Sequence, residues 1–412
     1  MGKRVDAVRR KYNTVKMEEV FQDLNRQFIR LKDRDKKCNN LILHSVLEDI
    51  ISRMRACDNL FDSMNPRLDY LGSYYDGLRV GEPNEYDINV ILRIPIDENK
   101  IILDARESEC GHTCVRLPSE FRRLAKSPVT ASKGFEKTIM WCNAKYRFSV
   151  TKFRSWIQSV VDTTINTLPV KDGKRFIKLN NSCYFIESKR SGPANTINII
   201  KCNNTVIDVD LVPTFAFTLP KKPVNSSVLF TKVSATNIQQ YFVVPKPTQN
   251  DFSWRLTFPI QERHLIRGKN NLKSTVRIIK HLRDVQGFKK LSSYYIKTLF
   301  LWEIVPENEM MWKNKSLSFL VIYMLKKLRD CLIKGEIKNY WCPEHNLIEK
   351  IKKNTCQNWG NRLNVIVNAL EKRGKCNASI VLEYFTKNIK NSAVQLVHDK
   401  HNLTKKIENI PT

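Results

Sequence analysis

Two acidic residues separated by one position stand at the start of a strand-like apolar run, shortly after a Gly-Ser turn. The turn is Gly72-Ser73-Tyr74-Tyr75, and the acids are Glu85 and Asp87, which precede the run from Ile88 to Leu92. Side chains separated by one position on a β-strand project from the same face. The sequence therefore predicts a strand that carries two carboxylates on one face, near a turn whose backbone N–H groups and hydroxyl can bind phosphate.

A third acid is expected from a neighbouring strand, because Mg²⁺ usually shares its oxygen ligands between a few carboxylates and substrate phosphates. Alternation from Val206 to Pro213 places Asp208 and Asp210 on one face of a second predicted strand, and either could be the ligand. The run from Thr196 to Ile200 and the turn signal Asn203-Asn204 predict a hairpin that delivers this acid. This ordered set is typical of a nucleotidyltransferase active site.

Length and composition indicate a globular protein of the cytoplasm. A chain of 412 residues can bury a large core, and we expect two closely packed lobes. The longest apolar stretch, Leu317 to Leu325, is too short to span a membrane, and the N-terminus lacks the apolar segment of a signal peptide. Eleven cysteines without a regular spacing favour a reducing compartment. We therefore expect no contact with membranes.

The charge balance predicts a polyanionic partner. Seventy Lys plus Arg against 41 Asp plus Glu give a net charge of +29, more than solubility or nucleotide substrates require. The basic residues that we expect to contact nucleic acid are Arg26, Arg30, Lys32, Lys36, Lys37, Arg263, Arg267, Lys269 and Lys273.

Helical periodicity from Met17 to about Arg55 predicts a long N-terminal helix with a break near 37–40. Strand patterns dominate from about 70 to 255, and helical patterns follow from about 260. We therefore expect an α+β fold with a basic flexible tail at 1–15, a core at 16–260 and a helical lobe at 261–412.

Several blocks of the chain resemble the cyclic GMP-AMP synthase-like receptors, within the Mab-21 group of nucleotidyltransferases. The likeness covers roughly residues 40 to 390. The blocks are Gly72 to Tyr75 with Pro83 to Asp87, Asp210 to Pro213, Lys189 to Ala194, Val244 to Lys246, Ser253 to Phe258, Leu291 to Thr298, and Tyr340 to Leu347. The resemblance implies a bilobal nucleotidyltransferase core, with a mixed sheet and a long N-terminal spine helix, followed by a C-terminal helical lobe.

The resemblance also assigns roles to individual residues. It implies that Glu85, Asp87 and Asp210 hold two Mg²⁺ or Mn²⁺ ions, and it favours Asp210 over Asp208 because of the Asp-Leu-Val-Pro context. Its nucleotide contacts fall on Gly72 and Ser73 for phosphate, Arg255 and Thr257 for guanine, Tyr294 for base stacking, and Lys280, Ser293 and Lys297 for the triphosphate. Arg, Tyr and Lys offer a planar fork, a stacking face and a mobile charge for these contacts.

No structural zinc is expected. The cluster Cys110-Gly111-His112-Thr113-Cys114 lacks a fourth ligand at zinc-finger spacing, and Cys342 with His345 falls in a block expected to pack. The zinc insertion of the family's DNA-sensing members is absent, since 261–280 contains His264 but no cysteine.

The sequence thus predicts a sensor enzyme of antiviral innate immunity that joins ATP and GTP into cyclic GMP-AMP when long double-stranded RNA binds. A basic surface can read an A-form duplex through phosphates and 2′-hydroxyls without base-specific motifs. Dimerisation on nucleic acid is left open. The alternatives are a double-stranded DNA sensor of the same chemistry, a catalytically silent Mab-21-like scaffold, and a polymerase that makes linear oligonucleotides.

Overall fold

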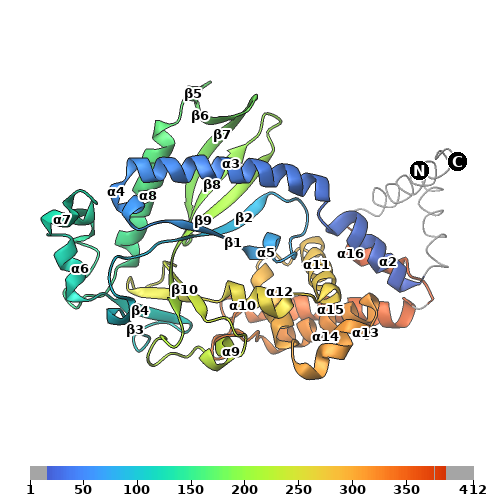
Figure 1. The fold of residues 1–412 in the computed structure, drawn as a ribbon. Coiled ribbons are helices and arrows are strands. Elements are labelled where there is room, and N and C mark those ends of the chain that lie inside the picture. The colour runs from blue at the N-terminus through green and yellow to red at the C-terminus, as the bar shows by residue number, and fades with distance from the viewer. Residues whose placement is uncertain (1–15, 375, 387–412) are drawn as a thin grey trace.

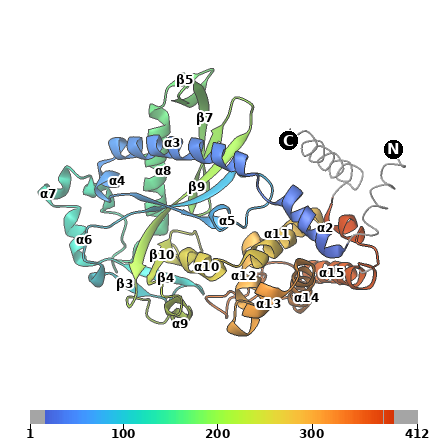
Figure 2. The same cartoon turned by 45° about the vertical axis from the view of Figure 1, so that its right-hand side comes forward.

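The computed structural model describes residues 16–374 and 376–386, which form a sheet-based lobe and a helical lobe (Figures 1 and 2). The fold is α+β, as the sequence predicted. The predicted basic tail at 1–15 and the end of the predicted helical lobe at 387–412 lie outside the described residues. Among the described helices, none is long and apolar enough to cross a membrane.

One mixed sheet forms the centre of the sheet-based lobe. Its strands are β1 (Arg67–Leu71), β2 (Glu85–Ile91), β3 (Ile102–Asp104), β4 (His112–Arg116), β5 (Val170–Lys171), β6 (Lys174–Leu179), β7 (Ser182–Ser191), β8 (Ala194–Ile200), β9 (Val206–Thr218), β10 (Gln240–Val244) and β11 (Ser253–Thr257). Their main order is β3-β4-β11-β10-β9-β8-β7-β6-β5, and β2 joins β9 while β1 joins β2. The predicted hairpin is confirmed, because β8 and β9 pair antiparallel.

Helices cover the sheet and build the second lobe. Those of the first part of the chain are α2 (Met17–Leu24), the π-helix η1 (Asn25–Ile29), α3 (Asp33–Cys57), α4 (Asn59–Ser63), α5 (Gly72–Tyr75), η2 (Glu98–Lys100), α6 (Ser119–Leu124), α7 (Pro128–Ala131), η3 (Phe135–Thr138), α8 (Val150–Thr167) and α9 (Phe230–Ser234). Those of the second part are α10 (Pro259–Ile266), α11 (Asn270–Val285), α12 (Ser293–Trp302), η4 (Pro306–Asn308), α13 (Glu309–Asn314), α14 (Leu317–Lys334), α15 (Lys353–Arg373) and α16 (Ile380–Phe385).

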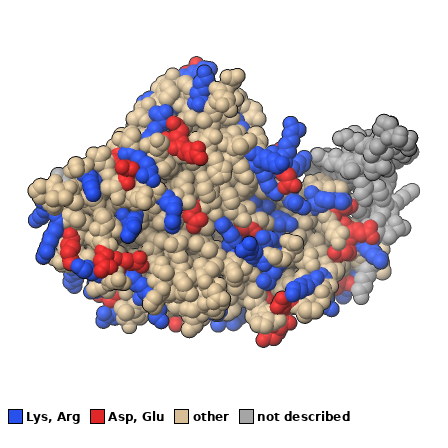
Figure 3. Space-filling view, viewed as in Figure 1, with Lys and Arg blue, Asp and Glu red and all other residues tan. Residues whose placement is uncertain are grey.

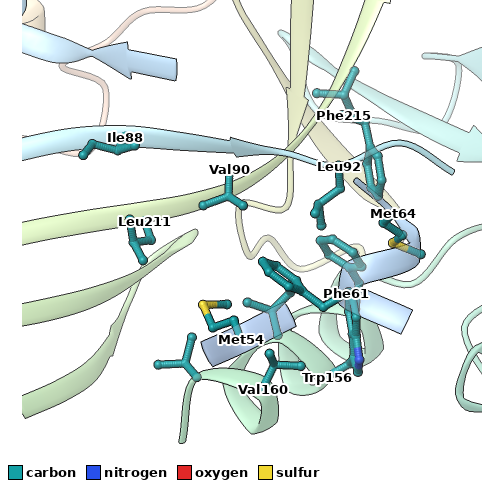
Figure 4. Packing of buried hydrophobic residues seen from close by; sticks show 14 of the residues in the cluster. Met54, Phe61, Met64, Ile88, Val90, Leu92, Trp156, Val160, Leu211 and Phe215 are labelled. Carbon is teal, nitrogen blue, oxygen red and sulfur yellow. The ribbon is translucent and has the colours of Figure 1, made fainter. Parts of the chain in front are cut away.

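A first hydrophobic core lies between the sheet and helices α3 and α8 (Figures 1 and 4). The face of β2 opposite the acids contributes Tyr86 and Ile88, both fully buried, and β9 contributes Val209 and Leu211. Figure 4 shows Met54 and Phe61 from the α3–α4 segment beside Val160 of α8. Trp254 of β11 is fully buried in this core.

The long N-terminal helix breaks earlier than predicted. The interruption lies at 30–32, and α3 continues through 37–40. Asn39 lies in that stretch and is buried, and its side chain donates to Pro83 O at 2.7 Å and accepts from Lys201 Nζ at 2.6 Å. These tertiary bonds supply partners for the amide within a helix.

The break divides the N-terminal segment between two cores. Val20, Phe21 and Leu24 of α2 belong to a second hydrophobic core, shared with α11, α14, α15 and α16. Figures 1 and 2 both place α2 beside this helical lobe, whereas α3 runs across the sheet. The first described helix therefore packs in the helical lobe, and the chain crosses to the sheet at 30–32.

A disulfide joins Cys110 and Cys342, which are separated by 232 positions of sequence and both pack in the first core. This pairing differs from the expectation of free thiols. Cys110 precedes β4 and Cys342 follows the helical lobe's α14, so the two cysteines come together only in the tertiary structure.

Removing the Phe153 ring should destabilise the first core. Phe153 of α8 is fully buried, with its ring centroid 5.1 Å from that of Phe215 and 5.4 Å from that of Trp254. We expect Phe153→Ala to lower the free energy of unfolding by about 3–5 kcal/mol in urea titrations. Phe319→Ala, at a position 44% exposed, should change it by less than about 0.5 kcal/mol. Equal losses would contradict this assignment of the core.

Candidate active site

The predicted acids lie on two neighbouring parallel strands. In the register of β2 and β9, Asp87 is opposite Asp210, and Glu85 is opposite Asp208. Glu85 is exposed and Asp87 and Asp210 are half-buried, whereas Tyr86 and Ile88 fill the core behind them. The alternation of β-strands thus turns the carboxylates toward the surface because the apolar residues between them face the core.

Crowding of the carboxylates changes their acidity. Burial, then repulsion from Glu85 and Asp210, raises the pKa of Asp87 to about 6. Burial also raises the pKa of Asp210, against a hydrogen bond from Thr196 Oγ1 at 2.5 Å. Such repulsion between neighbouring carboxylates is what a bound cation relieves. The donor set therefore fits divalent metals, which nucleotidyltransferases use.

The Gly-Ser turn lies directly against these acids. Gly72 begins α5 with a φ of +78°, a conformation that favours glycine. A Cβ atom at Gly72 would lie 1.8 Å from Asp87 Oδ2. Both the backbone conformation and the close approach exclude a side chain at position 72. The turn thus lies near the acid pair, as the sequence predicted.

Glu85 is held by a residue that the sequence analysis did not single out. The Arg79 guanidinium forms an ion pair with Glu85 and also donates to Asn84 Oδ1 at 3.0 Å. Among the described residues, no group of three His, Cys, Asp or Glu side chains is arranged to hold a metal ion. In this conformation the cationic side chain of Arg79, rather than a third carboxylate, contacts Glu85.

Asp208 has a different environment from Asp210. Its carboxylate accepts a hydrogen bond from the Asn198 amide on the neighbouring strand β8. Asp210 instead pairs in register with Thr196 and lies opposite Asp87. Asp210 therefore lies beside Asp87, whereas Asp208 lies two residues away on β9, opposite Glu85.

The predicted base contacts come from β11 and α12. Arg255 and Thr257 lie on one face of β11, and the Arg255 guanidinium is 5.8 Å from the centroid of the Tyr294 ring. Tyr294 Oη donates to Glu262 Oε1 at 3.2 Å. Ser293 Oγ accepts from Arg283 at 2.7 Å. A cationic fork and an aromatic ring thus lie together, as base recognition requires.

The two lysines predicted to bind triphosphate are already bonded to protein groups. Lys280 is buried and donates to Leu78 O at 2.8 Å, and burial lowers its pKa to about 8. Lys297 Nζ lies 2.7 Å from Asp76 Oδ2 and 2.8 Å from Glu262 Oε2. Burial alone would lower the pKa of Lys297, but these two carboxylates raise it.

The residues predicted to bind nucleic acid fall into two groups. Arg26, Arg30, Lys32 and Lys37 are exposed and Lys36 is half-buried near the junction of α2 and α3, where Figure 3 shows Lys and Arg gathered. Around α10 and α11, Arg267 is exposed and Lys269 and Lys273 are half-buried. Arg263 lies between the lobes, where it pairs with Asp76 Oδ1 at 3.0 Å and donates to Tyr70 O at 2.6 Å.

Three residues of the site, Asp76, Arg79 and Glu262, escaped the sequence analysis. Asp76 and Glu262 are buried acids, 2% and 5% exposed, that neutralise cations from distant positions. Such pairs have no local sequence pattern. The only signal was that Asp76 and Arg79 lie between the Gly-Ser turn and the acid pair.

Asp87→Asn should stabilise the metal-free protein above neutral pH. The folded-state pKa of about 6 lies above the reference value of 3.8, so folding with an ionised Asp87 becomes less favourable as pH rises through this interval. We expect a gain of about 3 kcal/mol at pH 8 in chelator, shrinking toward pH 5, in denaturant titrations. Asp330→Asn, on an exposed helix position, is the control. If the stability gained by Asp87→Asn did not depend on pH, the raised pKa of Asp87 would be contradicted.

Comparison with protein families gives two matches that follow the two lobes. Residues 74–268 match the Mab-21 protein nucleotidyltransferase domain, and residues 271–365 match the Mab-21 protein HhH/H2TH-like domain. The first match begins just after Gly72 and Ser73 and spans both acid strands and β11.

Similar proteins extend the match to most of the chain. A cyclic GMP-AMP synthase-like receptor of Tribolium castaneum is 32% identical over 387 residues, which cover 92% of this chain and 95% of the relative. The receptor of the same name from Aethina tumida is 31% identical, covering 90% and 91%. Cyclic GMP-AMP synthase-like receptor 1 of Drosophila erecta is 28% identical, covering 80% and 72%. The chain therefore belongs to the cyclic GMP-AMP synthase-like receptors, within the Mab-21 family of nucleotidyltransferases.

Proposed function

We propose that this protein joins ATP and GTP into a cyclic GMP-AMP second messenger when double-stranded RNA binds, as a cytoplasmic sensor of antiviral innate immunity. The observation that carries the proposal is the juxtaposition of Asp87 and Asp210 in register on β2 and β9, with Gly72 against Asp87. The similar proteins are named cyclic GMP-AMP synthase-like receptors, which supports the choice of product.

In the proposed reaction, Glu85, Asp87 and Asp210 hold the divalent ions. Bound ions would lower the pKa of the attacking ribose hydroxyl and neutralise charge on the α-phosphate and the departing pyrophosphate. The chain itself orients the reactants. Backbone N–H groups and the hydroxyl of Gly72-Ser73 would bind phosphate, and Ser293, Lys280 and Lys297 would contact the triphosphate.

Base selection would fall to β11 and α12. Arg255 offers two parallel donors to guanine acceptors, Thr257 adds a hydroxyl, and Tyr294 stacks on a base. The Arg255–Tyr294 contact holds the guanidinium and the ring together before a nucleotide arrives. Preorganised contacts of this kind cost less entropy on binding.

Double-stranded RNA is the proposed activator because the basic surface at the α2–α3 junction carries several exposed cations. A duplex read through its backbone needs only such a surface. The absence of cysteine from 261–280, the place of the zinc insertion in the DNA-sensing branch, also favours RNA. Equal activation by matched RNA and DNA duplexes would contradict this choice.

Asp210→Asn should abolish product formation and leave RNA affinity unchanged, because the change removes a metal ligand that is not part of the basic surface. The matched control is Asp208→Asn, on the same face of β9 but bonded to Asn198. We expect the control to retain most of the turnover. Product yield and RNA binding are measured on both variants, and full activity of Asp210→Asn would contradict the assignment.

Removing exposed cations from the α2–α3 junction should lower the affinity for RNA. It should also make that affinity depend less on salt concentration. For the triple variant Arg26→Ala, Arg30→Ala and Lys37→Ala, we expect the slope of log affinity against log salt to become shallower by about one for each RNA phosphate that the variant no longer neutralises. Lys313→Ala, Lys315→Ala and Lys334→Ala, on exposed positions of the helical lobe, form the control. An unchanged slope in the first variant would exclude this surface.

A further inference from the structure

The segment just after the Gly-Ser turn, residues 76–79, is held by cations of the helical lobe. Asp76, 2% exposed, pairs with Arg263 of α10 through Oδ1 at 3.0 Å and with Lys297 of α12 through Oδ2 at 2.7 Å. The carbonyls that follow are bound as well. Arg277 donates to Gly77 O at 2.7 Å, and Lys280 donates to Leu78 O at 2.8 Å.

Backbone hydrogen bonds tie this segment to the turn itself. The Asp76 N–H donates to Gly72 O at 3.0 Å, and the Leu78 N–H donates to Ser73 O at 2.8 Å. Gly72 in turn lies against the Asp87 carboxylate. A displacement of the Asp76 side chain would therefore move the phosphate-binding turn and the acid beside it.

Both oxygens of Asp76 are committed to cations, so the residue is not suited to be a fourth metal ligand. A buried carboxylate is stable only when it is paired and hydrogen-bonded, and removing one partner leaves an uncompensated charge. The pairs come from α10 and α12, two helices of the other lobe. The carboxylate of Asp76, the C-cap residue of α5, is thus positioned by those helices.

The same network reaches the proposed base-binding residue. Lys297 also pairs with Glu262, and Glu262 Oε1 accepts from Tyr294 Oη at 3.2 Å and from Trp341 Nε1 at 3.0 Å. One continuous set of bonds therefore runs from Tyr294 through Glu262, Lys297 and Asp76 to Gly72.

We propose that Asp76 is a positioning residue, which holds the Gly72-Ser73 turn against Asp87 through its ion pairs with Arg263 and Lys297. The proposal deepens the proposed function and rests on it for the effect on turnover. The anchoring of the turn by the helical lobe does not depend on which reaction the site performs.

The test compares the wild type with Asp76→Asn, Asp76→Glu and a matched control. The control is Asp104→Asn, because Asp104 is 5% exposed and lies near two cations, Arg106 at 3.0 Å and Arg116 at 3.8 Å, on edge strand β3. Amide hydrogen exchange, measured by mass spectrometry without nucleotide or metal, reports on residues 72–79. We expect faster exchange there in Asp76→Asn and no change there in Asp104→Asn.

Turnover is measured below the unfolding transition of each variant. We expect kcat of Asp76→Asn to fall by about 100-fold, as for a displacement near 1 Å, with RNA affinity unchanged. Asp76→Glu keeps the negative charge, so it should retain most of the wild-type kcat. A purely structural role predicts lower stability with an unchanged kcat for the folded protein, and that result would overturn the proposal.

The outcomes separate this proposal from the proposed function. A wild type that forms no product, with faster exchange at 72–79 in Asp76→Asn, refutes the reaction and supports the anchor. An active wild type with unchanged exchange and turnover in Asp76→Asn refutes the anchor alone. If Asp76→Asn does not fold, Arg263→Gln gives the same exchange readout from the other lobe, and unchanged exchange at 72–79 overturns the proposal.

Discussion

The parallel pairing of β2 with β9 is the constraint on which the site depends. It places Asp87 opposite Asp210, although burial and repulsion among the neighbouring carboxylates raise the pKa of both groups. The pairing is maintained because the opposite face of each strand is buried, with Tyr86 and Ile88 on β2 and Val209 and Leu211 on β9. Core packing therefore holds the carboxylates in an arrangement that is unfavourable without a cation.

The helical lobe holds the segment that follows the Gly-Ser turn. The turn that faces Asp87 is followed by a segment that α10, α11 and α12 hold through Arg263, Lys280 and Lys297. The chain also crosses between the lobes at 30–32, where exposed cations of the N-terminal helices lie. The basic surface and the turn that we propose to bind phosphate therefore both lie where the two lobes meet.

Local pattern was sufficient for the acid strands, because alternation depends on near neighbours, and β8 and β9 form the predicted hairpin. It left Asp208 and Asp210 as alternatives, and the family resemblance selected Asp210, which lies opposite Asp87. It failed where the partner is distant. The helix continues past Asn39 because Pro83 and Lys201 bond its amide, and Cys110 finds Cys342 from 232 positions away. The two ion pairs of Lys297 had no sequence signal, because the acids that pair with it lie in other elements.

The most direct test of the central claim is to incubate the full chain with radiolabelled ATP and GTP, Mg²⁺ or Mn²⁺, and either double-stranded RNA, a matched DNA duplex or no nucleic acid. Products are then treated with phosphatase and separated by chromatography. The account predicts a phosphatase-resistant cyclic dinucleotide that forms only with RNA. A phosphatase-sensitive linear product, or no product under any of these conditions, would contradict it.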